Sequence, residues 1–188
     1  MSGGPPSTAA AVTATPVVFT IGHSTRPIED FIALLQAHGV QRLVDVRTVP
    51  RSRRNPQFAQ ENLPASLAAA GIAYEHRAGL GGFRRTSDAS PNKGWRNASF
   101  RGYADYMQTA PFEHELQWLI DTARREQVAI MCAEAVPWRC HRSLIADALL
   151  AHGVGSEEIV STTRRQARKL TPFAQVCGHQ VMYPPQDE

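Results

Sequence analysis

Residues 128–153, VAIMCAEAVPWRCHRSLIADALLAHG, join a strand, a chemically rich loop and a helix in one segment. Residues 128–131 form a short apolar run of the kind that buried strands contain. Four apolar residues then recur at helical spacing before Gly153, which is typical of a helix C-cap: Leu144, Ile145, Ala148 and Leu149. A strand that passes through a loop into a helix is the repeating unit of a parallel α/β sheet, so this stretch predicts that class.

The rest of the chain repeats the same alternation. Apolar runs predict further strands at residues 17–21, 43–46, 72–75 and 158–160. Helical patterns occupy residues 27–39, a stretch interrupted at Pro64 and closed by Gly71, then residues 102–109 and 112–126. We therefore expect an α/β fold with a mainly parallel sheet of about five strands and helices on both faces, in a Rossmann-like three-layer arrangement. Residues 77–100 should form a long loop, and an irregular tail should follow residue 160.

Composition limits the class of protein. The chain has 188 residues and 43% hydrophobic side chains, which suits one domain, expected at residues 17–188. Residues 1–16 lack charge and are rich in Gly, Pro, Ala, Ser and Thr, so they predict a flexible tail without the basic start of a secretory signal. No apolar run approaches the roughly 20 residues of a membrane-spanning helix. Three cysteines in no disulfide-scaffold spacing favour a reducing compartment, and we expect a cytoplasmic protein.

Arginine dominates the basic residues. The formal net charge is only +3, yet 20 residues are Lys or Arg and just Lys93 and Lys169 are lysine. A GC-rich genome is the interpretation we favour for most of these arginines, and the functional alternative is anion recognition, which guanidinium groups suit. The loop containing Arg51, Arg53 and Arg54 could track a phosphate backbone, so a nucleic-acid-binding or regulatory module is one alternative. Because no nucleic-acid-reading motif is recognisable, a small anionic molecule is the favoured partner.

Reactive or charged side chains follow four of the predicted strands. They are His23 and Ser24, Asp45 and Arg47, Glu75 and His76, and Cys132 and Glu134. Parallel strands end at one edge of a sheet, and ligands of open α/β sheets bind at that carboxyl edge. The four pairs therefore predict a site there. Asp45 and Arg47 point to the same side of their strand, so an ion pair between them is the structural alternative to catalysis.

The cysteine segment admits three interpretations. A thiol at a helix N-terminus beside His and Arg has a lowered pKa, which makes Cys132 or Cys140 a candidate nucleophile. Alternatively, Cys132, Cys140 and His141 could bind Zn or Fe, although their spacing matches no standard finger. In the third interpretation the cysteines are small core residues. Strand, cysteine, loop and Arg-bearing helix also resemble rhodanese-like sulfurtransferases and cysteine phosphatases, but Arg139 stands one residue too far for the phosphatase pattern.

Seven short motifs follow one another along the chain: TIGHS at 20–24, DVR at 45–47 with Pro50 and Ser52, LGG at 80–82, Phe100 with Tyr103, CAE at 132–134, CHR at 140–142 and MYP at 182–184. In this order they resemble the domain of unknown function 488 family. The resemblance implies an α/β domain but no activity. It marks as motif positions His23, Ser24, Asp45, Arg47, Cys132, Glu134, Cys140, His141 and Arg142. Residues 159–162 lack a histidine that many relatives carry in a late strand, and His179 is a candidate substitute.

These observations favour a small enzyme acting on an anionic substrate. Catalytic roles fall to Cys132, Glu134, Cys140 and His141, with His23, Ser24, Asp45, Arg47 and Arg142 holding the anion. A bound metal would use Cys132, Cys140 and His141. The alternative enzyme is a rhodanese-like sulfur or phosphoryl transferase with Cys132 as nucleophile.

Overall fold

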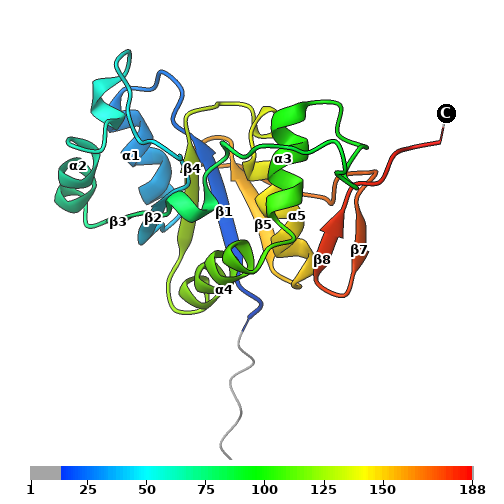
Figure 1. The fold of residues 1–188 in the computed structure, drawn as a ribbon. Helices are drawn as coiled ribbons and strands as arrows, with labels where there is room; N and C mark the ends of the chain where they lie inside the picture. The colour runs from blue at the N-terminus through cyan, green and yellow to red at the C-terminus, as the bar shows by residue number, and fades with distance from the viewer. Residues whose placement is uncertain (1–13, 188) are drawn as a thin grey trace, which may run out of the picture.

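The central sheet of the computed structural model, which describes residues 14–187, forms from the predicted apolar runs (Figure 1). Its strands are β1 (Val17–Gly22), β2 (Arg42–Asp45), β3 (Ala73–His76), β4 (Val128–Cys132), β5 (Gly155–Ile159) and β6 (Arg165–Ala167). Their spatial order is β3-β2-β4-β1-β5-β6, with β1 to β5 parallel and β6 antiparallel to β5. This is the expected α/β fold in a single domain.

The helices are α1 (Ile28–Ala37), α2 (Leu63–Ala69), α3 (Ala98–Tyr106), α4 (Ala110–Ala123) and α5 (Arg142–Ala151). Successive side chains of a strand point to opposite faces of the sheet. In β4, Ala129 and Met131 join the core cluster that contains the buried residues of α1 and α2. Val128, Ile130 and Cys132 join the cluster that contains those of α3, α4 and α5. The sheet thus has helices on both faces, and Cys132 faces the α5 side.

Strand register aligns the predicted site residues at one edge. Gly22, which precedes His23, pairs with Cys132, and Asp45 pairs with both Met131 and His76. The ends of β1, β2, β3 and β4 therefore lie side by side, as the strand-end argument predicted. Because these four strands are parallel, the residues that follow them in sequence all lie at the same edge of the sheet.

The structure corrects several expected boundaries. Pro64 lies in the first turn of α2, where proline is tolerated, and does not interrupt a helix. The segment after β5 is not irregular: it adds β6 to the sheet and forms a hairpin of β7 (Gln175–Cys177) and β8 (Gln180–Met182) beside α5 (Figure 1). These strands have three residues each, too few to show a period in sequence. Of the expected tail at residues 1–16, residues 1–13 lie outside the described residues.

The expected long loop at residues 77–100 is shorter and well anchored. It contains the 3₁₀ turn η2 (Ala78–Leu80) and ends where α3 begins at Ala98. Asp105 of α3 accepts hydrogen bonds from Ser90 at 2.6 Å and from Asn92 at 2.8 Å. Two further 3₁₀ turns are η1 (Pro56–Phe58) and η3 (Pro137–Arg139). No helix within residues 14–187 has both the length and the apolar character needed to cross a membrane.

A buried ion pair ties α5 to the sheet. Arg142, fully buried, donates to both carboxylate oxygens of Glu158 in β5, at 3.0 and 3.2 Å. The hydroxyl of Thr20 in β1 donates to the same carboxylate. A buried guanidinium without a counter-charge is costly, so Glu158 is required for this helix to pack where it does.

Removing that counter-charge should destabilise the fold. We predict that Glu158→Ala lowers the free energy of unfolding by about 3 kcal/mol, because Arg142 would stay buried without its partner. Glu157→Ala is the matched control, since Glu157 pairs with Arg165 at the surface and should matter by less than about 1 kcal/mol. Denaturant unfolding of both variants measures the difference. Equal effects would contradict this account of the ion pair.

Candidate thiol site

Two cysteine sulfurs meet at the end of β4. Cys132 is the last residue of that strand, and the loop through η3 returns the chain so that Cys140 lies just ahead of α5. The two Sγ atoms are 2.7 Å apart, and both residues are free thiols. Their exposed fractions are 3% and 6%, so the pair is nearly removed from water. The two thiols are in direct contact, and either sulfur can be the donor.

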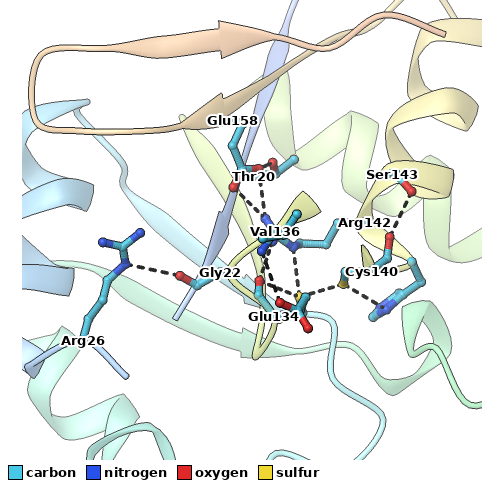
Figure 2. Close-up of polar contacts among 11 residues, drawn as sticks. Thr20, Gly22, Arg26, Glu134, Val136, Cys140, Arg142, Ser143 and Glu158 are labelled. Carbon is cyan, nitrogen blue, oxygen red and sulfur yellow. Dashed lines mark hydrogen bonds and ion pairs between the residues drawn. The ribbon is translucent and has the colours of Figure 1, made fainter. Parts of the chain in front are cut away.

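Arg142 binds the sulfur pair from the side of the sheet. Its Nε donates to Cys132 Sγ at 2.9 Å, and its Nη2 donates to the carbonyl oxygen of Glu134 at 2.7 Å. Figure 2 shows its guanidinium between Glu158 and Glu134. Burial alone would lower the pKa of Arg142, but the neighbouring Cys132 and Glu158 raise it above its ordinary value. Arg142 is therefore a permanent cation in the floor of the site.

His141 lies on the other side of Cys140. Its Nε2 is 2.9 Å from the carbonyl oxygen of Val46, which can only accept, so Nε2 carries the proton. That leaves Nδ1 with a lone pair, 3.5 Å from Cys140 Sγ. Burial lowers the pKa of His141 below its ordinary value, so the ring is neutral at neutral pH. A neutral imidazole in this tautomer can accept the thiol proton of Cys140.

The two thiols differ sharply in acidity. The hydrogen bond from Cys132, together with Arg142, lowers the pKa of Cys140 from 9.0 to about 7. Burial, followed by the hydrogen bond to Cys140, raises the pKa of Cys132. The two thiols titrate as a pair, and these directions favour the first negative charge on Cys140. At pH 7 the pair is partly ionised.

A second buried cation stabilises the end of β2. Arg47 forms a two-point ion pair with Asp45, with its Nε 2.9 Å from Oδ1 and its Nη2 2.7 Å from Oδ2. Tyr74 donates to the same carboxylate at 2.6 Å, and the carbonyl oxygen of Phe58 accepts from Arg47 at 2.8 Å. This is the structural ion pair considered from the sequence. With its charge neutralised in this way, Arg47 braces the site.

His23 packs beneath this ion pair. Its ring stacks on Phe58 with centroids 4.3 Å apart, and its Nδ1 lies 2.8 Å from the carbonyl oxygen of Ser24. Burial lowers the pKa of His23 from 6.5 to about 4. The neutral ring therefore donates from Nδ1 and turns Nε2 toward Arg47 Nη1, at 3.5 Å. His23 bonds its own turn and braces Arg47.

A pocket of about 380 Å³ opens over the sulfur pair. Cys132, Cys140 and His141 line it, and Val49 and Phe83 contribute exposed apolar side chains. Two further lining residues are the exposed arginines Arg51 and Arg139, which form no ion pair within residues 14–187. The pocket thus combines a thiolate, a neutral base and two free cations at its wall.

A second hollow of about 510 Å³ adjoins the first. Most of its lining residues are of polar types, among them His23, Ser24, Ser52, Arg53, Arg54 and Asn55. Residues 133–135 separate the two hollows, and Glu134 lines both of them with its side chain exposed. Ser24 adopts a left-handed backbone conformation with φ of 49°, which a side chain rarely takes, and this strain lies at the wall of the hollow.

Two glycines allow the site to close up. A Cβ atom at Gly22 would lie 1.9 Å from the carbonyl oxygen of Glu134, so only glycine lets the chain after Cys132 pass over the end of β1. A Cβ atom at Gly82 would lie 2.7 Å from His141 Nδ1. Gly22 belongs to the TIGHS motif and Gly82 to the LGG motif, and the sequence did not show why either is glycine. The structure gives the reason: another segment approaches the backbone too closely for a side chain.

The thiol pair in this structure does not have the spacing of two ligands on one metal ion. Two thiolates on one tetrahedral Zn²⁺ lie about 3.8 Å apart, given a Zn–S distance near 2.3 Å, whereas these sulfurs are 2.7 Å apart. The Arg142 guanidinium also occupies the space beside Cys132 and would repel a cation. Within the described chain, no three His, Cys, Asp or Glu side chains are arranged to hold a metal ion.

The structure thus brings together Cys132, Cys140, His141, Arg142 and the carbonyl of Glu134. It places His23, Asp45 and Arg47 in a bracing layer beside them, and Ser24 in the second hollow. Glu75 pairs with Arg42 and Arg77, while His76 bonds the Arg47 carbonyl. His179 packs against His152, and both line a different pocket, so it substitutes for no residue of this site. Sequence reasoning missed Glu158 and Tyr74, whose roles depend on strand pairing.

The buried neutral His23 should make stability depend on pH. Its pKa is near 4 in the folded protein and near 6.5 in the unfolded chain, so unfolding takes up a proton between these values. As the pH falls from 6.5 to 4, the free energy of unfolding should drop by roughly 2 kcal/mol more in the parent than in His23→Gln. Denaturant titrations at both pH values measure this, with the exposed His114→Gln as control. The same pH slope in all three proteins would contradict the prediction.

Comparison with known proteins gave one match. Searches of curated proteins and of solved structures found none. A family model matches residues 27–149, which include Asp45, Arg47 and the whole segment from Cys132 to Arg142. The match begins after His23 and ends before β5, so the first and last motifs of the resemblance lie outside it. It covers well over half of the chain, and this protein therefore belongs to the family described as Domain of unknown function DUF488.

Proposed function

We propose that this protein is a thiol-dependent enzyme in which the Cys140 thiolate attacks a small anionic substrate. The observation that supports it most is the sulfur pair at the floor of a pocket, with Cys132 in contact with Cys140 and with the guanidinium of Arg142 beside them. Buried structural cysteines do not need this arrangement, and they have raised pKa values in apolar surroundings. A reducing compartment such as the cytoplasm would keep both residues as thiols.

Cys140 is a better nucleophile than Cys132 in this arrangement. Cys132 holds its proton at neutral pH because burial raises its pKa by more than the neighbouring Arg142, which donates to its sulfur, lowers it. Its S–H group stabilises the Cys140 thiolate before attack and can protonate a leaving group afterwards. His141 offers a second proton acceptor through Nδ1. Glu134, exposed at the rim, is placed to exchange protons with solvent.

The substrate anion would be bound by Arg51 and Arg139. Arg47 and Arg142, which the sequence suggested for this role, are already neutralised by Asp45 and Glu158. Arg51 also belongs to the loop considered for nucleic-acid binding, but here it lines the thiol pocket. A pocket of about 380 Å³ suits a small molecule, which favours the enzyme over the nucleic-acid module.

The substrate class can be narrowed to anions with an electrophilic sulfur or phosphorus atom. With thiosulfate, the Cys140 thiolate would attack the outer sulfur, the S–S bond of thiosulfate would break, and sulfite would leave with the electron pair. The product is a persulfide on Cys140. Unlike the rhodanese-like scheme with Cys132 as nucleophile, this scheme uses the sulfur of lower pKa.

The acidity of Cys140 can be measured directly. In a Cys177→Ser background, which removes the exposed third thiol, alkylation of Cys140 by iodoacetamide should rise with pH and be half-maximal near pH 7. Adding Cys132→Ala removes the S–H donor, so the midpoint should move toward 9 and the rate at pH 7 should fall about tenfold or more. A midpoint near 9 in the parent would overturn the thiolate assignment.

Sulfur transfer tests the proposed reaction. Incubation with thiosulfate should release sulfite and add one sulfur atom to Cys140, as seen by mass spectrometry, and Cys140→Ser should abolish both. Arg139→Ala should raise the thiosulfate concentration at half-maximal rate about tenfold, the effect of losing one charged hydrogen bond. In the same Arg139→Ala variant, alkylation of Cys140 by iodoacetamide, which carries no charge, should proceed at the parent rate.

Arg124→Ala is the matched control for that experiment, because Arg124 is exposed and pairs with Asp121 at the end of α4. It should behave as the parent. Sulfite release that survives Cys140→Ser would exclude Cys140 as the nucleophile. If thiosulfate and an aryl phosphate both fail to modify Cys140, this substrate class is wrong.

A further inference from the structure

We propose that Cys132 and Cys140 also form a dithiol–disulfide centre that exchanges electrons with small anionic disulfides. This inference rests on the proposed thiolate of Cys140 but adds a second, resolving role for Cys132. It assigns to the site a two-electron redox activity that nucleophilic attack by Cys140 alone does not require.

The distance between the sulfurs supports this activity. The two Sγ atoms are already 2.7 Å apart, and a disulfide bond is about 2.05 Å long, so small side-chain movements suffice to form the bond. The backbone that carries them is fixed on both sides. Cys132 is the last residue of the central strand β4, and the carbonyl of Cys140 accepts from the amide and the hydroxyl of Ser143 in α5. No segment must rearrange to bring the thiols together.

The acidity difference assigns the order of steps. A thiolate attacks a disulfide, and its pKa near the ambient pH makes Cys140 the attacking group. Cys140 would attack one sulfur of oxidised glutathione, the S–S bond would break, and one glutathione thiolate would leave. Cys132, deprotonated by His141 or solvent, would then attack Cys140 Sγ and release the second glutathione. The protein is oxidised by two electrons, and one disulfide is reduced to two thiols.

The pocket suits this reaction partner. Oxidised glutathione carries several carboxylates, and Arg51 and Arg139 at the pocket wall form no ion pair with the other described residues. Cys140 and Cys132 both line the pocket, so a sulfur that reaches one thiol is close to the other. Charge complementarity and the adjacent second thiol both favour exchange with a small anionic disulfide.

Oxidation should leave the fold in place. Arg142 keeps its two bonds to Glu158 and its bond to the Glu134 carbonyl, so it loses only the contact with Cys132. The Cys140 thiolate, in contrast, disappears. The disulfide form would therefore lack the proposed nucleophile while retaining the packing of α5.

The test uses the full chain carrying Cys177→Ser, which leaves only the two pocket thiols. It is incubated with oxidised glutathione at pH 7.5, quenched by rapid alkylation and examined by mass spectrometry. We expect loss of both thiols together, with no glutathione attached, and recovery of both after reduction. In the Cys132→Ser, Cys177→Ser variant the reaction should stop with one glutathione bound to Cys140.

Two results would overturn the inference. If the Cys177→Ser protein accumulates a stable glutathione adduct on Cys140 that never closes, Cys132 is not a resolving thiol, although the proposed nucleophile survives. If neither cysteine reacts with oxidised glutathione while Cys140 is still alkylated rapidly at pH 7, the pocket excludes disulfides, and again only this inference fails. Absence of both reactions would remove the proposed function as well.

Discussion

The buried guanidinium of Arg142 is the contact on which the rest of this structure depends. It joins the start of α5 to β5 through Glu158, to the loop after β4 through the Glu134 carbonyl, and to the sulfur of Cys132. Glu158 neutralises most of the charge of Arg142. The main effect of Arg142 on the sulfur pair is therefore to hold Cys132 in position, and its stabilisation of a negative charge on the pair is the smaller effect. This balance agrees with a Cys140 pKa that is lowered to about 7 and no further.

A buried arginine paired with a carboxylate occurs twice at this edge of the sheet. Arg47 is held by Asp45 at the end of β2 as Arg142 is held by Glu158, and each arginine also bonds a main-chain carbonyl. Two neutralised arginines therefore brace the strand ends on which the thiols sit, whereas Arg51 and Arg139, which have no ion-pair partner among residues 14–187, line the pocket where we propose that the anion binds. The buried arginines, Arg47 and Arg142, are paired with carboxylates, whereas the exposed Arg51 and Arg139 keep their charge at the pocket. A local anion site is therefore compatible with a net charge of only +3.

The positions of most strands and of the strand-end residues could be predicted from the sequence. The contacts between side chains of different strands could not, because they depend on which strands lie side by side in the sheet. Apolar runs located β1 to β4, and parallel topology then placed Cys132, Asp45 and His23 at one edge. The partners of Arg142 and Arg47 were not predictable, since Glu158 and Tyr74 lie in strands whose neighbours only the sheet order defines. The tail strands β6 to β8 were missed because three residues show no period. The metal hypothesis depends on the distance between the two thiols, which sequence spacing does not contain.

Titration of the cysteines by NMR would test the central claim most directly. With ¹³C-labelled cysteine in the Cys177→Ser protein, the Cβ shift of each pocket cysteine reports its own protonation state. We predict that the Cys140 signal titrates near pH 7 while the Cys132 signal keeps its thiol position well above that pH. If Cys132 titrates first, the roles of the two sulfurs are reversed. If both remain thiols beyond pH 9, the site holds no thiolate at neutral pH and the proposed chemistry is wrong.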